Sequence, residues 1–566
     1  MSFAAPIGIS DFRSLRAADA TYVDKTASIA ELLCSPMQVQ LFPRPRRFGK
    51  SLWLSTLQAF VDRAPQGREG ADERRALFEG LAIWDDPAAR THLARYPVIA
   101  MSFKDVKYDT WDDCRRGIIG VIVRAFLVHR ALRPQLDGYD ATIFDAVISR
   151  QADLVLYSES LAFLSEVLHR HYGERAVVLI DEYDTPIHAG YSHGYYDQVV
   201  GFFRNLLSGG LKDNAHLFKG VLTGILRVAK ESIFSGLNNL DVYSILRPEH
   251  ATSFGFTAAE VESLAQAAEA SEHLPTIRDW YDGYVFGGET LYNPWSVLKF
   301  LDSRDKVPRA HWVATGSDDV LRRMLTRGSL GALPDQEALL AGDSVERTLA
   351  EPLALRDIDG RDDSAWSLLL FSGYLTATEV VHGDEEVRVR LRIPNREVRR
   401  MFMSLVGGWW RAGLGSDMAV DAVLAAVLAG EGERVREGLE DLFLAHVSYH
   451  DLPQPARELP YHMFVLGLLV RLADDYEVRS NPESGRGRAD VLITPRSPGA
   501  AGVVMEFKRF YPERDGSPEA ALDAAMAQID DRAYAAALRD RGAAPVHAYA
   551  AVFEGKRVHL RVRTEA

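Results

Sequence analysis

The chain has 566 residues, of which 47% are hydrophobic, and its formal net charge is −14 at pH 7. A chain of this length folds as about two to four domains. The negative charge argues against a surface that coats nucleic acid non-specifically, although it leaves room for a local basic groove. The two cysteines give neither a disulfide framework nor a zinc site, so we expect a protein of the reducing cytoplasm.

The sequence gives no sign of export or membrane insertion. Residues 1–16 lack the basic stretch and apolar core of a signal peptide. The longest apolar runs, such as residues 461–470, are too short to span a membrane. We therefore expect no membrane association.

Residues 1–295 alternate short apolar runs with helical patterns. This alternation is typical of a parallel sheet covered by helices, so the sequence predicts an α/β domain here. The predicted strands are residues 39–42, 97–103, 176–180 and 219–223.

The rest of the chain divides into two further regions. Residues 296–445 read as a mostly helical middle region, with a hairpin over 377–393 and a surface connection over 430–438. Residues 446–566 read as a small α/β domain. Its predicted elements are a helix at 461–473, strands at 489–494 and 502–507, an alanine-rich helix at 518–539, and strands at 547–553 and 558–562.

A candidate phosphate-binding loop, RPRRFGKS at residues 44–51, follows the first predicted strand and precedes a predicted helix. Gly49 lets the backbone approach a phosphate closely. Lys50 would reach the β- and γ-phosphates of a nucleotide, and the Ser51 hydroxyl would bind Mg²⁺. The alternative is a chance triplet at the start of a helix.

One position of this loop departs from the usual pattern. The motif G-x-x-x-x-G-K-[ST] begins with a glycine, and this chain has Arg44 there. That replacement is acceptable only if the turn needs no positive φ. Arg46 and Arg47 add positive charge beside the loop.

The second part of the candidate nucleotide site is the run AVVLIDEYD at residues 176–184. Five apolar residues end in Asp181 and Glu182, as in a Walker B strand that delivers carboxylates to the carboxyl edge of a sheet. Asp181 would hold Mg²⁺, and Glu182 would activate the attacking water. Thr223 and Arg227, at the end of the next strand, would sense the γ-phosphate; the alternative is an ordinary core strand and a solvent-exposed arginine.

Several stretches together resemble the AAA-ATPase-like proteins of bacteria, which typically carry a C-terminal PD-(D/E)XK nuclease domain. The matching stretches are YVDKT, FPRPRRFGKSL, VVLIDEYDTPI, LTGILRVAKESIFSGLNNL, SFGFT and WYDGYVFGGETLYNPWSVLKFL. The resemblance covers nearly the whole chain and includes the RPRRFGKS form of the loop. It implies a P-loop ATPase-like parallel sheet with ATP and Mg²⁺ as cofactors, a helical middle region and a restriction-endonuclease-like α/β domain. In the YNPW stretch, core packing is favoured over an adenine platform.

The C-terminal region carries the residues that such a nuclease needs. Asp490 opens one predicted strand, and Glu506 and Lys508 share one face of the next. The two carboxylates could bind one or two Mg²⁺ ions, and Lys508 could position the nucleophile or stabilise developing negative charge. Glu-x-Lys is a weak signal alone, but this strand is otherwise apolar and the chain has only 11 lysines against 54 arginines.

Other polar residues near this pattern are more weakly indicated. Glu458 could be a further metal-binding acid, or an ordinary charge at a helix start. Gln528 and Tyr534 resemble a Gln/Tyr helix motif near some nuclease sites, with a shorter gap. Arg479, Arg486 and Arg488 offer local positive charge for a phosphate backbone, or belong to a polar hairpin.

The sequence therefore supports two functional hypotheses. The first is an ATP-controlled, Mg²⁺-dependent nuclease whose substrate is nucleic acid, with DNA favoured over RNA, acting in defence or mobile-element control by analogy. The second is a nucleotide-gated signalling or recognition protein whose nuclease-like domain only binds. The complete residue sets favour the first, and the net charge favours the second. A homo-oligomer is compatible with both.

Overall fold

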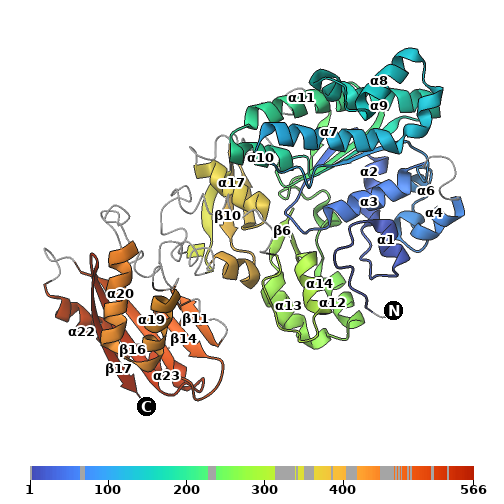
Figure 1. Ribbon diagram of the computed structural model, residues 1–566. Helices are drawn as coiled ribbons and strands as arrows, with labels where there is room; N and C mark the ends of the chain where they lie inside the picture. The colour runs from blue at the N-terminus through green and yellow to red at the C-terminus, as the bar shows by residue number, and fades with distance from the viewer. Residues whose placement is uncertain are drawn as a thin grey trace. The chain divides into compact units, whose positions relative to one another are not determined.

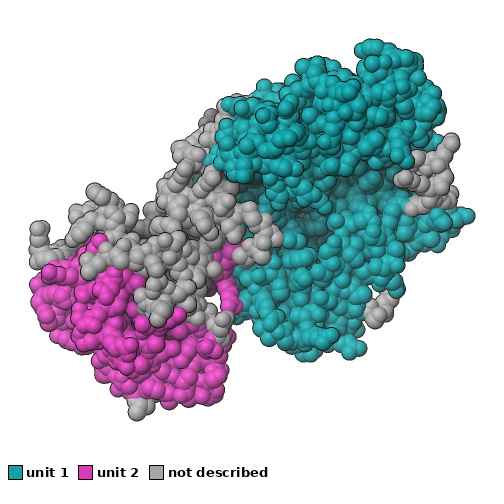
Figure 2. All heavy atoms as spheres, in the orientation of Figure 1, with its two compact units in different colours: residues 1–314, 346–397 teal, residues 315–345, 398–566 magenta. Residues whose placement is uncertain are grey.

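The computed structural model forms two compact units, coloured separately in Figure 2. Unit 1 comprises residues 1–314 and 346–397, and unit 2 comprises residues 315–345 and 398–566. The described residues are 3–63, 71–226, 238–312, 338–339, 342–349, 362–383, 386–402, 417–446, 465, 468–469, 472, 475–480, 483–484, 487–510, 516–531 and 534–565. Segment 346–397 of the predicted middle region thus belongs with the N-terminal residues.

Unit 1 is built on a five-stranded parallel sheet with the order β2-β3-β4-β1-β5. Its strands are β1 (Val39–Pro43), β2 (Val98–Ser102), β3 (Ala176–Asp181), β4 (Leu217–Gly224) and β5 (Leu240–Val242). β1 and β3 are buried along their whole length, as expected for central strands covered on both faces. The four strands predicted from the sequence are confirmed.

Helices lie on both faces of this sheet (Figure 1). At the start of two long helices a side chain caps a free backbone N–H group: Thr110 caps α7 and Asp153 caps α9. The helices up to β5 are α1 (Phe12–Ala17), α2 (Thr26–Cys34), α3 (Lys50–Val61), α4 (Ala71–Phe78), α5 (Ala82–Asp85), α6 (Pro87–Arg90), α7 (Trp111–Val128), α8 (Gly138–Ile148), α9 (Leu154–Tyr172), α10 (Thr185–His193) and α11 (Tyr196–Leu211).

The remainder of unit 1 is a helical segment followed by a small sheet. The helical segment has its own apolar core, which includes Ile277, Tyr281 and Phe300. Its elements are α12 (Ala258–Ala267), α13 (Leu274–Tyr281), the hairpin β6 (Tyr284–Phe286) and β7 (Glu289–Leu291), and α14 (Pro294–Asp302). The sheet has the order β8-β10-β9. The elements in this part of unit 1 are β8 (Val345–Leu349), α17 (Asp362–Ser372), β9 (Thr376–His382) and β10 (Val387–Arg392). The antiparallel pairing of β9 with β10 confirms the predicted hairpin.

Unit 2 contains a mixed five-stranded sheet with the order β11-β14-β15-β16-β17. Only β15 and β16 pair in parallel, and α22 with α23 connects them. The strands are β11 (Tyr476–Ser480), β14 (Val491–Pro495), β15 (Gly502–Arg509), β16 (Val546–Glu554) and β17 (Arg557–Glu565). A separate short hairpin pairs β12 (Glu483–Ser484) with β13 (Gly487–Arg488). The four strands predicted here are confirmed.

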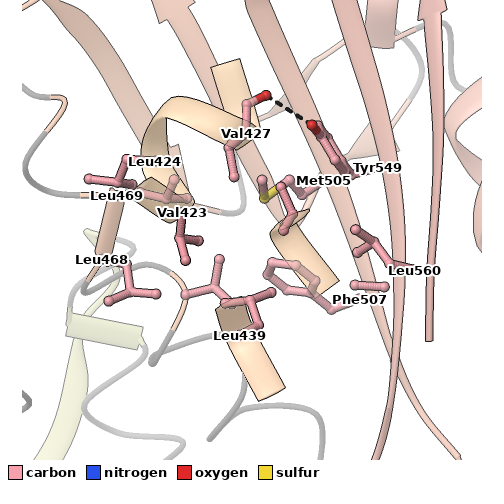
Figure 3. A pocket seen from close by; sticks show the side chains of 13 residues that line it. Val423, Leu424, Val427, Leu439, Leu468, Leu469, Met505, Phe507, Tyr549 and Leu560 are labelled. Carbon is pink, nitrogen blue, oxygen red and sulfur yellow. Dashed lines mark hydrogen bonds between the residues drawn. The ribbon is translucent and has the colours of Figure 1, made fainter. Parts of the chain in front are cut away.

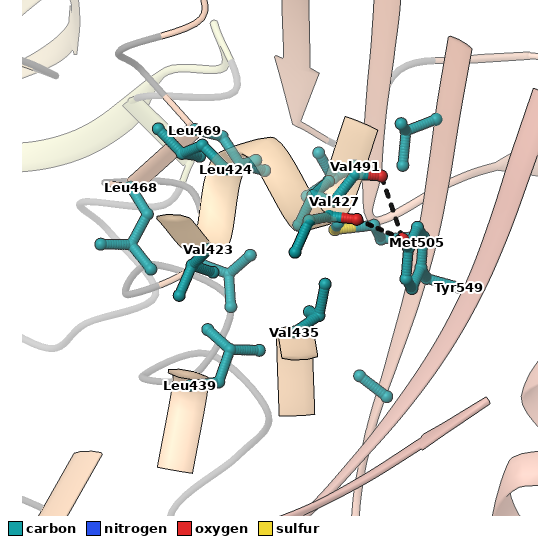
Figure 4. Packing of buried hydrophobic residues seen from close by; sticks show 14 of the residues in the cluster. Val423, Leu424, Val427, Val435, Leu439, Leu468, Leu469, Val491, Met505 and Tyr549 are labelled. Atoms are coloured by element: carbon teal, nitrogen blue, oxygen red, sulfur yellow. Dashed lines mark hydrogen bonds between the residues drawn. The ribbon is translucent and has the colours of Figure 1, made fainter. Parts of the chain in front are cut away.

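Both faces of the unit 2 sheet are covered by apolar side chains. On one face pack α22 (Pro518–Asp531) and α23 (Tyr534–Arg539). On the other pack α19 (Asp417–Ala429) and α20 (Gly432–His446), as Figure 4 shows for Val423, Val427 and Leu439 against Met505 and Tyr549.

Two predicted segments of this part of the chain have different outcomes. The prediction of a surface connection at 430–438 was wrong from Gly432 onward, because these residues start α20 and Val435 is buried. The predicted helix at 461–473 falls mostly outside the described residues.

A small cavity lies within this second apolar layer (Figure 3). Its walls are formed by side chains such as Val423, Leu439, Phe507 and Leu560. Its volume of ≈ 10 Å³ is at most enough for one water molecule, and such a water would find few polar partners here. The cavity is therefore a packing feature. Across the described residues, no helix is long and apolar enough to cross a membrane.

Candidate functional site

The candidate phosphate loop joins β1 to α3 at the carboxyl edge of the unit 1 sheet. Gly49 caps α3 with φ of 86°, a conformation that a side chain would strain. Lys50 is buried, and its Nζ donates hydrogen bonds to the carbonyl oxygens of Arg44 (2.8 Å) and Pro45 (2.9 Å). Burial lowers the pKa of Lys50, while Glu182 and Asp181 act in the opposite direction. The ammonium group thus lies inside the loop, where a phosphate would be bound.

Asp181 connects three elements of the predicted nucleotide site. Its Oδ2 accepts a hydrogen bond from Ser51 Oγ on α3 at 2.7 Å. Its Oδ1 accepts one from Thr223 Oγ1 on β4 at 2.6 Å. The structure therefore brings together three residues that are up to 172 positions apart, at the end of adjacent strands β3 and β4. Their side chains offer the oxygen atoms that Mg²⁺ prefers.

Glu182 and Arg227 complete the predicted set. Glu182 adopts φ of 51°, which is uncommon for a residue with a side chain. Its charge acts on both Lys50 and Arg47, so it lies close to the loop. Arg227 lies outside the described residues.

Asp184 is a residue of this site that the sequence interpretation missed. It is 1% exposed, and its Oδ2 accepts hydrogen bonds from the backbone N–H groups of Ile225 (2.8 Å) and Leu226 (2.9 Å). Burial would raise the pKa of Asp184, but hydrogen bonds from His188 and from this backbone hold it below its ordinary value. Asp184 therefore fixes the chain that follows Thr223. Its only sequence signal is its place three residues after Asp181.

Arg44, which replaces the usual glycine, has a structural role. Its side chain is fully buried, and its guanidinium group donates to the carbonyl oxygens of Pro43 (2.9 Å), Tyr243 (2.5 Å) and His250 (3.0 Å). It also lies over the ring of Phe254 at 5.1 Å. Burial lowers the pKa of Arg44 to about 9. The left-handed conformation is instead adopted by Arg47, with φ of 67°. The turn at Arg44 therefore needs no glycine.

Two tryptophans hold the outer side of the loop. Trp312 Nε1 donates to the Arg46 carbonyl oxygen at 3.2 Å. The Arg47 guanidinium group lies 4.1 Å from the centre of the Trp295 ring, a cation–π contact. Trp295, from the YNPW stretch, is thus a partner of the loop, a role that the sequence interpretation missed. Tyr292 of the same stretch is buried, as expected for core packing.

Glu397 supports one of these tryptophans. Its Oε1 accepts hydrogen bonds from the Trp312 backbone N–H at 2.7 Å and from Ser296 Oγ at 3.0 Å. Burial raises the pKa of Glu397 from 4.5 to about 7, although these hydrogen bonds act to lower it. A carboxyl group with a pKa of about 7 is thus linked to the phosphate loop through Trp312.

The predicted nuclease residues come together on β14 and β15. Val491 pairs with Met505 in the antiparallel ladder, so Asp490 and Glu506 are the next facing pair, on the side of the sheet covered by α22. Glu506 is 1% exposed, and Lys508 Nζ donates to its Oε1 at 3.1 Å. Asp490 Oδ2 accepts a hydrogen bond from the Phe507 backbone N–H at 2.6 Å.

The more weakly indicated residues are only partly described. Glu458 and Arg486 lie outside the described residues. Arg479 forms an ion pair with Glu477 at 2.7 Å, and the β12–β13 hairpin contains Arg488. Gln528 is half-buried on α22, and Tyr534 is fully buried at the start of α23. Within the described part of the chain, no group of three or more His, Cys, Asp or Glu side chains is placed to hold a metal ion.

These features define the class of protein: a P-loop ATPase-like unit joined to a nuclease-like mixed sheet. Residues 6–234 match the family model for a predicted AAA-ATPase, and residues 456–562 match that of the PD-(D/E)XK nuclease superfamily. The chain is thus similar to predicted AAA-ATPases in its N-terminal part and to PD-(D/E)XK nucleases in its C-terminal part. It is 29% identical, over 96% of its length and 95% of the relative, to an uncharacterised protein in the vnfD 5′ region of Azotobacter chroococcum mcd 1.

We predict that Arg44→Gly, which restores the usual glycine, destabilises unit 1. The change leaves the carbonyl groups of Tyr243 and His250 without their donor and opens a cavity, at a cost of about 3–5 kcal/mol. The measurement is thermal unfolding. Arg47→Gly is the control, because Arg47 is exposed and already has a positive φ. Equal melting temperatures for Arg44→Gly and the unsubstituted protein would contradict the role assigned to Arg44.

We also predict that Glu397 makes the stability of unit 1 depend on pH. Because its folded-state pKa is raised to about 7, the folded protein keeps a proton that the unfolded chain releases above pH 4.5. The free energy of unfolding therefore falls as pH rises between these values, by up to about 3 kcal/mol. Glu397→Gln should remove this dependence. The melting temperature of the variant, relative to that of the unsubstituted protein, should therefore increase as the pH rises from 5 to 8. A constant difference across this range would refute the assignment.

Proposed function

We propose that this protein binds and hydrolyses ATP in unit 1 and uses unit 2 to cleave phosphodiester bonds in nucleic acid, with Mg²⁺ in both reactions. DNA is the favoured substrate. The observation that carries the nuclease proposal is Glu506, a carboxylate buried within an apolar strand and paired with Lys508 at 3.1 Å. Burial of a carboxylate is costly unless a cation or hydrogen bonds compensate it, so this arrangement is unusual for a purely structural strand.

The residues of unit 2 fit a divalent cation. Asp490 and Glu506 supply carboxylate oxygens from facing positions, and such hard donors suit Mg²⁺. Asp490 and Glu506 would hold the ion, and Glu458, which lies outside the described residues, is the further ligand that the sequence predicts. A bound Mg²⁺ would supply an activated water and polarise the scissile phosphate.

Lys508 and Asp490 have separate tasks in this proposal. Lys508 places its ammonium group at the edge of the site, where its side chain is 29% exposed, and stabilises the negative charge that develops on the phosphate. Asp490 is held in place by the Phe507 N–H, so its carboxylate keeps a fixed direction. Because β14 and β15 position these groups, the site is formed by rigid strands.

The residues of unit 1 fit a nucleoside triphosphate and its Mg²⁺. Lys50 exchanges its hydrogen bonds to the loop carbonyls for bonds to the β- and γ-phosphates. Ser51 and Asp181 would hold the metal ion, which neutralises phosphate charge when bound. Glu182 orients the attacking water, and Thr223 and Arg227 read the γ-phosphate. Three further residues of the loop, Arg46, Arg47 and Gly49, surround the bound phosphates in this proposal.

A second function is favoured by the net charge of −14. In this case the protein is a nucleotide-gated recognition protein, and its nuclease-like domain binds without cleaving. By analogy with other nuclease–ATPase fusions, either function would serve defence or the control of mobile elements in the cytoplasm, with a homo-oligomer compatible with both.

We predict metal-dependent cleavage by the full-length protein. Plasmid DNA incubated with protein, Mg²⁺ and ATP should be cut. Glu506→Gln or Lys508→Met should lower the rate by about 100-fold or more, since the first removes a charged ligand of the metal ion and the second removes charge stabilisation at the reacting phosphate. Glu519→Gln is the control, because Glu519 is exposed on α22. If neither DNA nor RNA is cut with any metal or nucleotide, the nuclease assignment fails and the binding function is favoured.

We predict that nucleotide binding depends on Lys50. Lys50→Ala should weaken the binding of a fluorescent ATP analogue by about 10-fold or more, because a charged hydrogen bond to phosphate in a buried site is worth about 1.5–3 kcal/mol. Lys299→Ala is a matched control, since Lys299 contacts Trp295 outside the loop. Unchanged affinity in Lys50→Ala would show that residues 44–51 are not the phosphate loop.

A further inference from the structure

A groove of about 800 Å³ lies along β2, the edge strand of the unit 1 sheet, and α7. Its walls carry four basic side chains and two acidic ones, which is a local excess of positive charge on a chain of net charge −14. One acid, Asp113, is already compensated by Arg116 and by a hydrogen bond from Thr110. The groove is therefore electrostatically suited to an anion.

Two arginines converge in this groove without an acidic partner among the described residues. Arg124 on α7 and Arg150 after α8 both point toward Gly120: their terminal nitrogens lie 3.5 and 3.7 Å from the position that a β-carbon of Gly120 would occupy. Both arginines are exposed, and Gly120 is buried. Two guanidinium groups this close repel each other, and a phosphate between them would remove the repulsion and accept hydrogen bonds from both.

An aromatic ring lies further along the same wall. Tyr108 packs against Gly117, one turn before Gly120 on α7; a β-carbon there would come within 2.6 Å of the ring. The Tyr108 carbonyl oxygen also accepts a hydrogen bond from Tyr195 Oη at 2.5 Å, so its loop is anchored. The side of the ring away from α7 remains available, since Tyr108 is 40% exposed. A fixed, exposed aromatic ring beside cationic groups is the arrangement on which bases of single strands stack.

The groove is also directly connected to the candidate nucleotide site. Ser102, at the end of β2 in the groove, pairs with Asp181 in the parallel register. The next residue, Phe103, donates its backbone N–H to the Asp181 carbonyl oxygen at 3.0 Å. A ligand in the groove therefore lies one strand away from the Walker B carboxylate.

We propose that this groove binds single-stranded nucleic acid. Arg124 and Arg150 bind the phosphodiester backbone, and Tyr108 stacks with a base. A volume of about 800 Å³ is that of a small-ligand site, so it takes a few nucleotides of one strand and excludes a duplex. An acidic peptide would use the arginines but would gain nothing from the tyrosine. The choice of nucleic acid as the ligand rests on the proposed nuclease function. The evidence for an anion-binding groove comes from its geometry and charge, and does not depend on that function.

The test is the binding of a fluorescent 12-nucleotide oligothymidylate to the full-length protein, measured by anisotropy in EDTA without nucleotide. Arg124→Glu/Arg150→Glu should weaken binding by about 10-fold or more. It should also lower the slope of log affinity against log salt by about 1.4, since each phosphate contact to a single strand contributes about 0.7. The control is Arg130→Glu/Arg175→Glu, which makes the same charge change at two exposed residues outside the groove.

Tyr108 provides a second, independent measurement. Tyr108→Ala should weaken binding by about fivefold or more with an unchanged salt slope, whereas Tyr108→Phe should bind normally because stacking needs only the ring. The proposal is overturned if no single strand binds, if both arginine pairs weaken binding equally, or if polyglutamate competes fully and Tyr108→Ala has no effect. Since no metal is present, loss of binding is distinct from loss of cleavage. Groove binding without any cleavage would support the groove and refute the nuclease.

Discussion

The hydrogen bonds to Asp181 are the constraint on which unit 1 depends. This carboxylate is held by Ser51 from the helix after the loop and by Thr223 from the neighbouring strand. Both contacts require that β1, β3 and β4 keep their parallel register, because a shift of one residue would turn the Asp181 side chain to the other face of the sheet. The loop, the three strands and α3 therefore form one rigid framework, inside which the Lys50 side chain is buried.

The strands and both sets of motif residues could be predicted because their signals are local. Buried strands are continuous apolar runs, and the carboxylates within or at the end of such runs, Glu506 in β15 and Asp181 at the end of β3, stand out against that background. The role of Arg44 could not be predicted in this way. Its acceptors, the carbonyls of Tyr243 and His250, are 199 and 206 positions away and are backbone groups, so their residue types carry no signal.

The middle region shows the same limit. The hairpin of β9 and β10 was predicted from the sequence, but nothing local shows that this segment belongs to unit 1. Tertiary contacts decide it: Thr376 Oγ1 accepts a hydrogen bond from the Val285 N–H, and the Pro394 carbonyl lies against Gly283. Likewise α20 was missed at Gly432, because a run rich in Gly, Glu and Arg reads as a connection until Val435 and Leu439 are placed against a sheet.

The division of the chain has a consequence for how the two units are encoded. The chain passes between the two units three times, after residues 314, 345 and 397. The described helices and strands of unit 2, from α19 to β17, nevertheless follow residue 397 as one continuous stretch of sequence. The nuclease-like match, residues 456–562, lies within this stretch. The part that carries Asp490, Glu506 and Lys508 is therefore encoded as one piece, whereas unit 1 is assembled from two separate segments, 1–314 and 346–397.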